Sequence, residues 1–406
     1  MQYLEQQTVV SFDTCVNDGN VTGSGIDGGG FVGEIASNAN MNMTISNSIN
    51  NGFVSGSANF SGGFIGLISS NTNMTMTISN STNNGVVTGE LEEGGFVGRI
   101  IGNTNMTMII SNSINNAIVT GKNNNIGGFV GILYSNTEMT TTISHSTSSG
   151  NVTGNGNIGG FVGFISNNVN MTATILNSTN DGNVNGSNWY IGGFVGVIYK
   201  NTNLFMTISD IVNNGFVTGS GKNAGGLVGD IINNINMDTT ISDSANNGIV
   251  TGSYVGGLVG HIDGNTEMSI QFSNSINSGF VTSNEDFVGG FVRLIDSNTN
   301  MVIAISNSTN SGKVTGTKGY EGGFVGLFYS NTNMTGSISY SVNSGIITGV
   351  DFVGGFVGLI SSESDSYSIL VDTINSANKG SVSGTEGMAC GFVCVDPDYN
   401  VNVNTT

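Results

Sequence analysis

The sequence predicts an all-β chain folded as a parallel β-solenoid of about twelve coils, each about 32 residues long. Three observations predict this fold: a fixed repeat period, apolar residues that alternate with hydroxyl residues, and glycine pairs at regular intervals. Copies of a Gly-Gly-Phe-Val-Gly motif recur every 31 to 33 residues, and a degenerate copy begins at Cys390. Such a period indicates stacked units, because one short unit cannot bury its apolar face alone.

Each copy contains three short apolar runs separated by turn-forming residues. In the copy that begins at Gly62, the runs are 62–68, 74–78 and 85–89. Met and Ile alternate with Thr and Ser in the second run, which places the apolar side chains on one face of a strand. Asn-Gly, Thr-Gly and Gly-Gly pairs lie between the runs, as turns require. We therefore expect three strands and three corners in each coil, and no helix.

Stacking of identical coils also predicts ladders of like residues along the solenoid. The second run should contribute buried Met and Ile ladders, represented by Met74 and Ile78. Asparagine recurs at three corner positions, represented by Asn71, Asn73 and Asn83. Stacked Asn side chains can hydrogen bond to one another along the stacking axis. The corners should therefore carry Asn ladders.

The repeats divide the chain into an N-terminal cap (1–12), a repeat array (13–395) and a C-terminal tail (396–406). The array opens in mid-repeat, so we expect the chain to be a segment of a longer protein. At the other end, Ser366 and Ser368 replace a buried Met pair, and we expect this change, followed by Pro397, to end the array.

Two of the three cysteines, Cys390 and Cys394, lie at the end of the array. In an extended strand their separation is about 13 Å, which is too far for a disulfide without a tight turn. We expect small packing residues there, with a reactive pair as the alternative.

The charge balance excludes two classes of partner. The net charge is −19, with only eight Lys and Arg residues, so no basic stripe can hold nucleic acid. Binding to an anionic membrane surface is disfavoured for the same reason. No apolar run is long enough to insert in a membrane, and the first twenty residues do not resemble a signal peptide.

The repeat resembles a known family. The motif at 94–98, followed by Ser111-Asn112-Ser113 and Val119, is similar to the GLUG repeat of large surface and secreted proteins, many of them adhesin-like. The resemblance covers 13–395, and an extra Asn-Thr-Asn-Met-Thr-Met segment lengthens each unit. It implies a β-solenoid with a surface or secreted role, with the cytoplasm as the alternative location. It implies no catalytic residues.

Motifs for cofactors and catalysis are weak. Two Gly-x-Gly-x-x-Gly matches, 23–28 and 154–159, precede no predicted helix, and the Asp-containing nonapeptide of calcium-binding solenoids does not recur. The two histidines, His145 and His261, are expected to be exposed variants, and carboxylates such as Asp263 and Asp296 look scattered. We expect no enzyme activity, no cofactor and no metal.

Two surfaces are candidates for binding. Aromatic residues occur two positions before the Gly-Gly pair and should form an outward stripe that suits sugar rings or the apolar edge of another protein, or that merely shields the corner. The stripe comprises Tyr190, Tyr254, Phe287, Tyr320 and Phe352, and Phe60 holds the same repeat position nearer the N-terminus. A lateral contact face for self-association is expected on the outside of the first strand. It comprises Ile132, Tyr134, Phe164, Val197 and Tyr199, together with Val130, Val162 and Val195.

Arg293 replaces the last glycine of its motif, at a position predicted to face inward. A buried unpaired Arg is costly. We favour a bulge that turns Arg293 outward, with pairing to Asp296 or Glu267 as the alternative.

The leading functional hypothesis is a non-enzymatic, rigid acidic rod at the cell surface or secreted, which presents loops for adhesion to a glycan or a protein. One alternative is a structural spacer or filament segment that associates end to end. A third is ice binding by a Thr grid on one flat face. The grid comprises Thr75, Thr77, Thr140, Thr142, Thr172 and Thr174, and is interrupted by Ile109, Phe205, Asp238, Gln271 and Val302.

Overall fold

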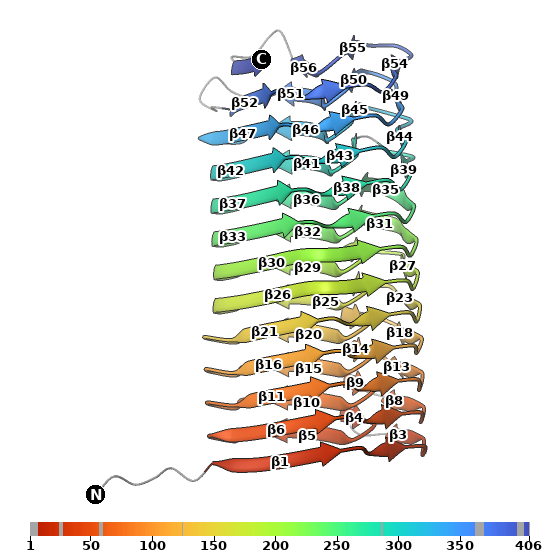
Figure 1. Ribbon diagram of the computed structural model, residues 1–406, viewed down its shortest axis with the longest axis vertical. Helices are drawn as coiled ribbons and strands as arrows, with labels where there is room; N and C mark the ends of the chain where they lie inside the picture. The colour runs from red at the N-terminus through yellow and green to blue at the C-terminus, as the bar shows by residue number, and fades with distance from the viewer. Residues whose placement is uncertain are drawn as a thin grey trace, which may run out of the picture.

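The computed structural model of the chain is a parallel β-solenoid of about 11 turns, each of about 33 residues (Figure 1). It describes residues 7–23, 27–56, 60–123, 125–285, 287–361, 369–395 and 402–405. None of these residues is helical, and their strands form three sheets of 23, 12 and 22 strands. The predicted fold class is confirmed.

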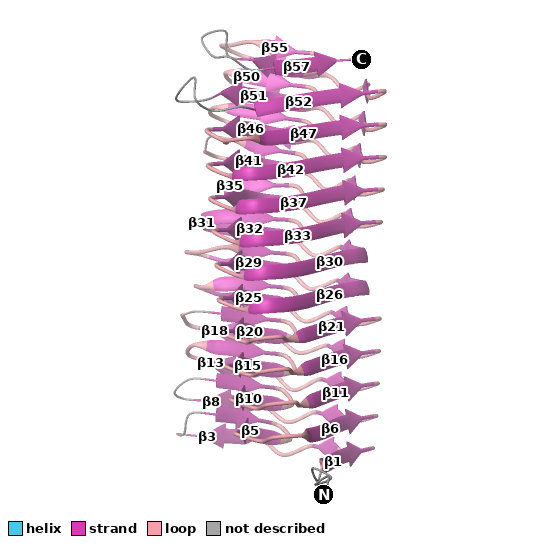
Figure 2. Cartoon of the chain, turned by 90° about the vertical axis from the view of Figure 1, so that its left-hand side faces the viewer, coloured by secondary structure: helices cyan, strands magenta, loops and turns pink. Residues whose placement is uncertain are grey.

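The coil that follows the Gly62 motif shows how the three apolar runs form the three sheets. β10 (Ile65–Ser69) belongs to the 12-stranded sheet. β11 (Thr75–Ser79) and β12 (Thr82–Asn83) belong to the 23-stranded sheet. β13 (Val87–Gly89) and β14 (Glu92–Gly94) belong to the 22-stranded sheet. Each strand pairs in parallel with its counterpart in the next coil, as the stacked arrows of Figure 2 show.

The 12-stranded sheet contributes one strand to each coil. Its strands are β5 (Val32–Ala36), β10, β15 (Val97–Ile101), β20 (Val130–Tyr134), β25 (Val162–Ser166), β29 (Val195–Tyr199), β32 (Val228–Ile232), β36 (Val259–Asp263), β41 (Val292–Asp296), β46 (Val325–Tyr329), β51 (Val357–Ser361) and β56 (Val393–Val395).

The Gly-Gly pair makes a sharp corner between the 22-stranded and 12-stranded sheets. A Cβ on Gly62 would collide with the carbonyl oxygen of Ile65, and one on Gly63 with that of Gly95 in the next coil. Both positions therefore need glycine. Other corners use non-glycine residues in the left-handed region, such as Asn73 and Asn80, with φ of 52° and 48°. Asn tolerates this conformation better than most residues.

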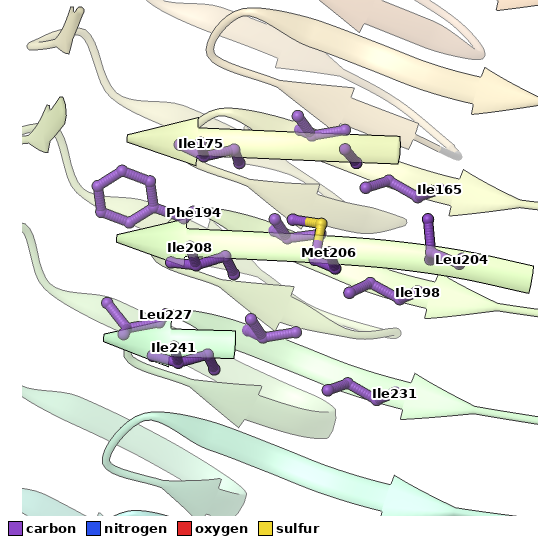
Figure 3. Close-up of a cluster of buried hydrophobic side chains, with 14 of the residues drawn as sticks. Ile165, Ile175, Phe194, Ile198, Leu204, Met206, Ile208, Leu227, Ile231 and Ile241 are labelled. Atoms are coloured by element: carbon purple, nitrogen blue, oxygen red, sulfur yellow. The ribbon is translucent and has the colours of Figure 1, made fainter. Parts of the chain in front are cut away.

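The main core lies between the 12-stranded and 23-stranded sheets and is built from ladders of like side chains (Figure 3). Ile175, Ile208 and Ile241 form one ladder, and each is at most 2% exposed. A Phe ladder packs at the Gly-Gly corner, where the rings of Phe64 and Phe96 stack at 4.8 Å. That spacing matches the separation of adjacent strands in a sheet. The predicted Met and Ile ladders are confirmed.

The predicted Asn ladders are present at all three corner positions. Two of the ladders are buried. In one, Asn83 Nδ2 donates to Asn115 Oδ1 at 2.9 Å. In the other, Asn201 Nδ2 donates to Asn234 Oδ1 at 3.0 Å and to the Ile165 carbonyl oxygen at 3.0 Å. The backbone N–H of Asn201 also donates to Asn234 Oδ1, at 2.9 Å. In an exposed ladder, Asn203 Nδ2 donates to Asn170 Oδ1 at 2.8 Å. The Asn201 amide thus satisfies the corner backbone as well as its neighbour.

The expectation about the terminal cysteines is wrong. Cys390 and Cys394 form a disulfide, with Cα atoms 5.5 Å apart. They occupy the first and last positions of a Gly-Gly-Phe-Val-Gly motif, so they flank the sharp corner described above. The chain turns back between them, and the extended-strand distance does not apply.

The ends of the chain are described only in part. β1 (Thr8–Asp13) pairs in parallel with β6 (Met41–Ser46), so the second half of the predicted cap continues the 23-stranded sheet. The first six residues of the cap, Ser366, Ser368 and Pro397 lie outside the described residues. Within the described part of the chain, no helix is long and apolar enough to span a membrane.

The core ladders make a direct stability prediction. Ile143 is 0% exposed in the main core, so Ile143→Asp should lower the free energy of unfolding by about 4 kcal/mol or more, because it buries an unpaired charge. Thr140→Asp in the same strand is the control, since Thr140 is exposed. Thermal unfolding followed by circular dichroism checks both. Equal melting temperatures for the two variants would contradict the assignment of Ile143 to the inward face of its strand.

A second, smaller core in the 22-stranded sheet contains two carboxyl groups in a mostly apolar ladder, in which Ser61 precedes Glu93. Glu93 and Glu321 are 0% exposed and stack on Ile126 and Val353 of the following coils. No well-aligned hydrogen bond reaches their carboxylate oxygens from the described residues. Burial, reinforced by nearby carboxylates, raises each pKa to about 9. Both groups are therefore neutral at pH 7.

These two groups predict a pH-dependent stability. The folded pKa lies above the ordinary value of 4.5, so the stability contributed by the neutral carboxyls is fully present below about pH 4.5 and is lost as the pH rises through about 9. The double variant Glu93→Ile, Glu321→Val matches the neighbouring ladder residues. It should gain about 1–3 kcal/mol per site at neutral pH, and more toward pH 9.

Melting temperatures of the double variant and the wild type between pH 4 and pH 9 check this prediction. Glu138→Gln, at an exposed position, is the control and should follow the wild-type profile. A difference between the double variant and the wild type that stays constant across this range would show that the buried carboxyls do not titrate as described.

Candidate functional site

The two predicted binding surfaces meet in one groove on the outside of the Gly-Gly corner. The residue two before the Gly-Gly pair lies on the 22-stranded sheet or directly before one of its strands, as Tyr190 and Phe287 do. The residues five and seven positions after the first glycine lie on the 12-stranded sheet. Two pockets, of about 490 and 410 Å³, lie where these rows face each other. We call the surface that contains both pockets the corner groove. Its strands β32, β36 and β41 are neighbours in the stack (Figure 1).

The C-terminal part of the corner groove is apolar. Leu294, Leu327 and Leu359 form a cluster on the 12-stranded sheet, and Phe287, Tyr320, Phe352 and Tyr329 pack against it. The rings of Phe287 and Tyr320 stack with centroids 5.2 Å apart, and Tyr320 meets Phe352 edge to face at 5.4 Å. Three residues of the aromatic stripe are thus half-buried in the groove wall, and both ring contacts join successive coils.

The remaining stripe residues lie farther toward the N-terminus. Tyr190 and Tyr254 are half-buried and line the larger pocket. Burial raises the pKa of Tyr190 to about 12, and the carboxylate of Asp230 adds to the shift. Phe60, 9% exposed, lies under the guanidinium of Arg99, 4.5 Å from its ring centroid. The predicted outward direction of the stripe holds, but the stripe faces a groove wall rather than open solvent.

The lateral contact face is corrected in part. Val130, Val162 and Val195 were expected to point outward, and this is wrong, since all three belong to the main core. The chain bends at the corner, which turns the first residue of each of these strands inward. The more distal residues do point away from the core. Ile132 and Val197 are nevertheless only 3% and 1% exposed, while Tyr134, Phe164 and Tyr199 are half-buried.

The larger pocket has a polar floor that the sequence analysis missed. Asp230 is 0% exposed, and burial raises its pKa well above the ordinary value. Asn223 Nδ2 donates to Asp230 Oδ2 at 2.8 Å. His261 Nδ1 lies 3.5 Å from Asp230 Oδ1 and 3.3 Å from Asn223 Nδ2. Burial also lowers the pKa of His261 well below its ordinary value, so the ring is neutral. The expectation that His261 is an exposed variant is wrong, whereas His145 is exposed as predicted.

Two further carboxylates stand beside this floor. Asp263 and Asp296 are ladder partners on β36 and β41, so they are adjacent rather than scattered. Burial raises the pKa of Asp263 to about 6, and the neighbouring Asp296 contributes. Ser297 Oγ donates to Asp296 Oδ1 at 2.8 Å.

Arg293 completes the pocket, and the favoured bulge is wrong. β36 and β41 pair without a register shift through Val292 and Leu294, which flank Arg293. Arg293 is 5% exposed; its Nε donates to the Gly260 carbonyl oxygen at 3.3 Å, and its guanidinium lies 5.0 Å from the ring centroid of Tyr254. Its charge opposes the rise in the pKa of Asp230 and of Asp263. Arg293 is therefore held by a carbonyl, a ring and the field of nearby carboxylates.

Basic side chains gather on the rings of the groove. Lys222 Nζ lies 4.7 Å from the ring of Trp189 and 5.3 Å from that of Tyr190, and Lys200 Nζ lies 5.0 Å from the ring of Tyr199. With Arg99 and Arg293, four of the eight Lys and Arg residues of the chain contact groove rings. Half of the basic residues of this acidic protein therefore lie against aromatic rings near the Gly-Gly corner.

A signal for the polar floor was present in the sequence. Asp230 and His261 occupy the same repeat position as Ile132, Phe164 and Val197. When the copies are aligned, this row changes from apolar to ionisable and back again within two coils. That local change is the signal for the site, although the same row also carries Glu34 and Arg99, single ionisable residues with apolar neighbours nearer the N-terminus.

Comparisons with known proteins add no identification. No family model matches the chain, and no curated protein or solved structure matches it significantly.

Proposed function

We propose that this protein is a non-catalytic acidic rod that binds a neutral saccharide chain along the corner groove. The observation that carries the proposal is the row of half-buried rings on one wall of a groove whose floor offers polar groups. A sugar ring has an apolar face and polar hydroxyl groups at its edge. The apolar face packs well on an aromatic side chain, which presents a flat apolar surface. Tyr254 and Tyr320 are two such rings, in separate pockets of the same groove.

The shape of the groove favours an extended ligand. The corner repeats every coil, so equivalent positions recur about every 4.8 Å along the rod. The apolar part around Tyr320 and the polar part around His261 adjoin, because Asp263 and Asp296 belong to adjacent strands. A chain of sugars can therefore place ring faces on the aromatics and hydroxyl groups on Asn223, Asp263 and Arg293.

The charge of the protein selects among saccharides. A net charge of −19 repels polyanionic glycans over the whole surface, and the cations at the groove are already engaged with rings and carboxylates. A neutral chain avoids this repulsion. The proposal is in keeping with the surface or secreted role that the resemblance to GLUG repeats implies.

The disulfide supports an oxidising location. Disulfides persist mainly in extracellular and periplasmic compartments and are rare in reducing cytosol. The Cys390–Cys394 bond therefore favours a surface or secreted rod over a cytoplasmic protein.

The Thr grid offers weaker support for ice binding. Its residues lie on the outer face of the 23-stranded sheet, where Thr140 and Thr172 are exposed. Phe205 and Val302 project from the same face, 54% and 50% exposed, and interrupt the lattice. We therefore retain the groove as the binding surface.

Binding to an array of neutral glycans tests the proposal. We expect the double variant Tyr254→Ser, Tyr320→Ser to bind at least about tenfold more weakly than the wild type, because it removes one ring from each pocket. The matched control, Phe205→Ser with Phe280→Ser, removes two rings that are 54% and 56% exposed elsewhere. It should bind as the wild type does.

Two outcomes would refute groove binding. One is a wild-type protein that binds no neutral glycan. The other is undiminished binding by the groove variant together with a lower melting temperature, which would mean that the rings only shield the corner.

A further inference from the structure

Three metal-ligating groups from two adjacent coils lie together where the two pockets of the corner groove adjoin: His261 and Asp263 line the larger pocket, and Asp296 lines the smaller one. His261 and Asp263 belong to β36, and Asp296 is the ladder partner of Asp263 on β41. One ligand atom from each residue lies within 4.8 Å of the other two. We propose that these three residues bind a divalent transition-metal ion of the Zn²⁺ type. This inference does not rest on saccharide binding.

The orientation of the His261 ring is the first argument. Its Nδ1 faces the buried Asp230 Oδ1 at 3.5 Å. Its Nε2 is buried, and no hydrogen-bond partner for it exists among the described residues. A histidine that ligates a metal typically directs its other ring nitrogen to a carboxylate, which fixes the ring and its tautomer. Asn223 Nδ2 also lies 3.3 Å from Nδ1, so the tautomer is set by the balance between Asn223 and Asp230. In the tautomer with the proton on Nδ1, Nε2 carries the lone pair that can bind an ion.

Asp230 provides an independent second observation. It is 0% exposed, and its Oδ1 accepts no hydrogen bond from the described residues, although Oδ2 is held by Asn223 at 2.8 Å. A fully buried carboxylate with one unsatisfied oxygen is costly unless a compensating charge is near. An ion on the far side of His261 supplies that charge through the imidazole.

The acidic groups around the pocket also favour a cation. Three carboxylates, those of Asp230, Asp263 and Asp296, surround His261. Arg293 is the guanidinium among them, and the ammonium of Lys222 lies outward, over Trp189 and Tyr190. Asp263 and Asp296 bring two carboxyl groups to the same point beside His261, and a divalent ion placed there is attracted by both.

The donor set selects the ion. Imidazole nitrogen with two carboxylates suits Zn²⁺ and its first-row neighbours, whereas Ca²⁺ and Mg²⁺ prefer oxygen ligands alone. Metal–ligand distances of about 2.1 Å place two ligands of one ion no more than about 4.2 Å apart. Rotation of the two half-buried Asp side chains is enough to close the remaining distance. Further coordination positions face the groove, where water or a ligand oxygen can fill them.

Calorimetric titration of the metal-free protein with ZnCl₂ tests the site. We expect one Zn²⁺ per chain in the wild type, and binding at least about tenfold weaker in His261→Gln and in Asp296→Asn. Asp230→Asn keeps all three ligands but loses the group that orients His261, and we expect it to weaken binding about tenfold. The matched controls are His145→Gln and Asp238→Asn, at exposed positions, which should bind as the wild type does.

Titration with CoCl₂ tests ligation directly, because the absorption spectrum of bound Co²⁺ depends on its ligands and would not change if His261 had only a structural role. A bound Co²⁺ with a nitrogen ligand gives a visible absorption band, which should be lost in His261→Gln and retained in His145→Gln. Circular dichroism of each variant establishes that it is folded. If His261→Gln does not fold, the Zn²⁺ affinity of Asp296→Asn, a change at the pocket rim, tests the site instead. Equal Zn²⁺ affinity in site variants and controls, or displacement of Zn²⁺ by equimolar CaCl₂, would overturn the proposal.

Discussion

The structure depends on parallel, in-register stacking of like side chains from one coil to the next. Each coil is too small to bury a core, so every apolar residue needs its counterpart one strand spacing away. The Phe rings stack at 4.8 Å because that is the separation their strands impose. The buried Asn ladder adds a polar constraint. Asn201 Oδ1 accepts both the side-chain and the backbone N–H of Asn168, which holds one corner to the next.

This constraint explains how the solenoid forms a local site without a motif. A surface row has one residue per coil, so a change of residue type over two or three coils creates a patch with its own chemistry. The row that contains Val197 becomes Asp230 and His261 and then returns to Leu294. The backbone register is unchanged through these strands. The polar pocket is therefore produced by side chains alone on an unaltered scaffold.

Polar residues inside a ladder show what the stacking tolerates. Glu93 and Glu321 replace apolar residues without a break in strand pairing, and burial keeps them neutral. Arg293 replaces a glycine at the corner, where a carbonyl and a ring receive its side chain. Neutralisation and local pairing are thus two ways in which this fold accommodates polar groups that its repeat pattern does not anticipate.

The sequence by itself determined the coil, because period and alternation depend only on spacing along the chain. It therefore predicted the buried ladder of Ile143, the corner ladder of Asn71 and the outward direction of Tyr254. The angle at the Gly-Gly corner was decided only by the tertiary structure. Strict alternation fails next to this corner: Val130 and Leu133 of the same strand both face the main core, whereas Ile132 does not. The turn also brings Cys390 to Cys394. The same corner brings the aromatic stripe against the 12-stranded sheet and His261 beside Asp296, a contact between segments of two coils that spacing within one copy does not reveal.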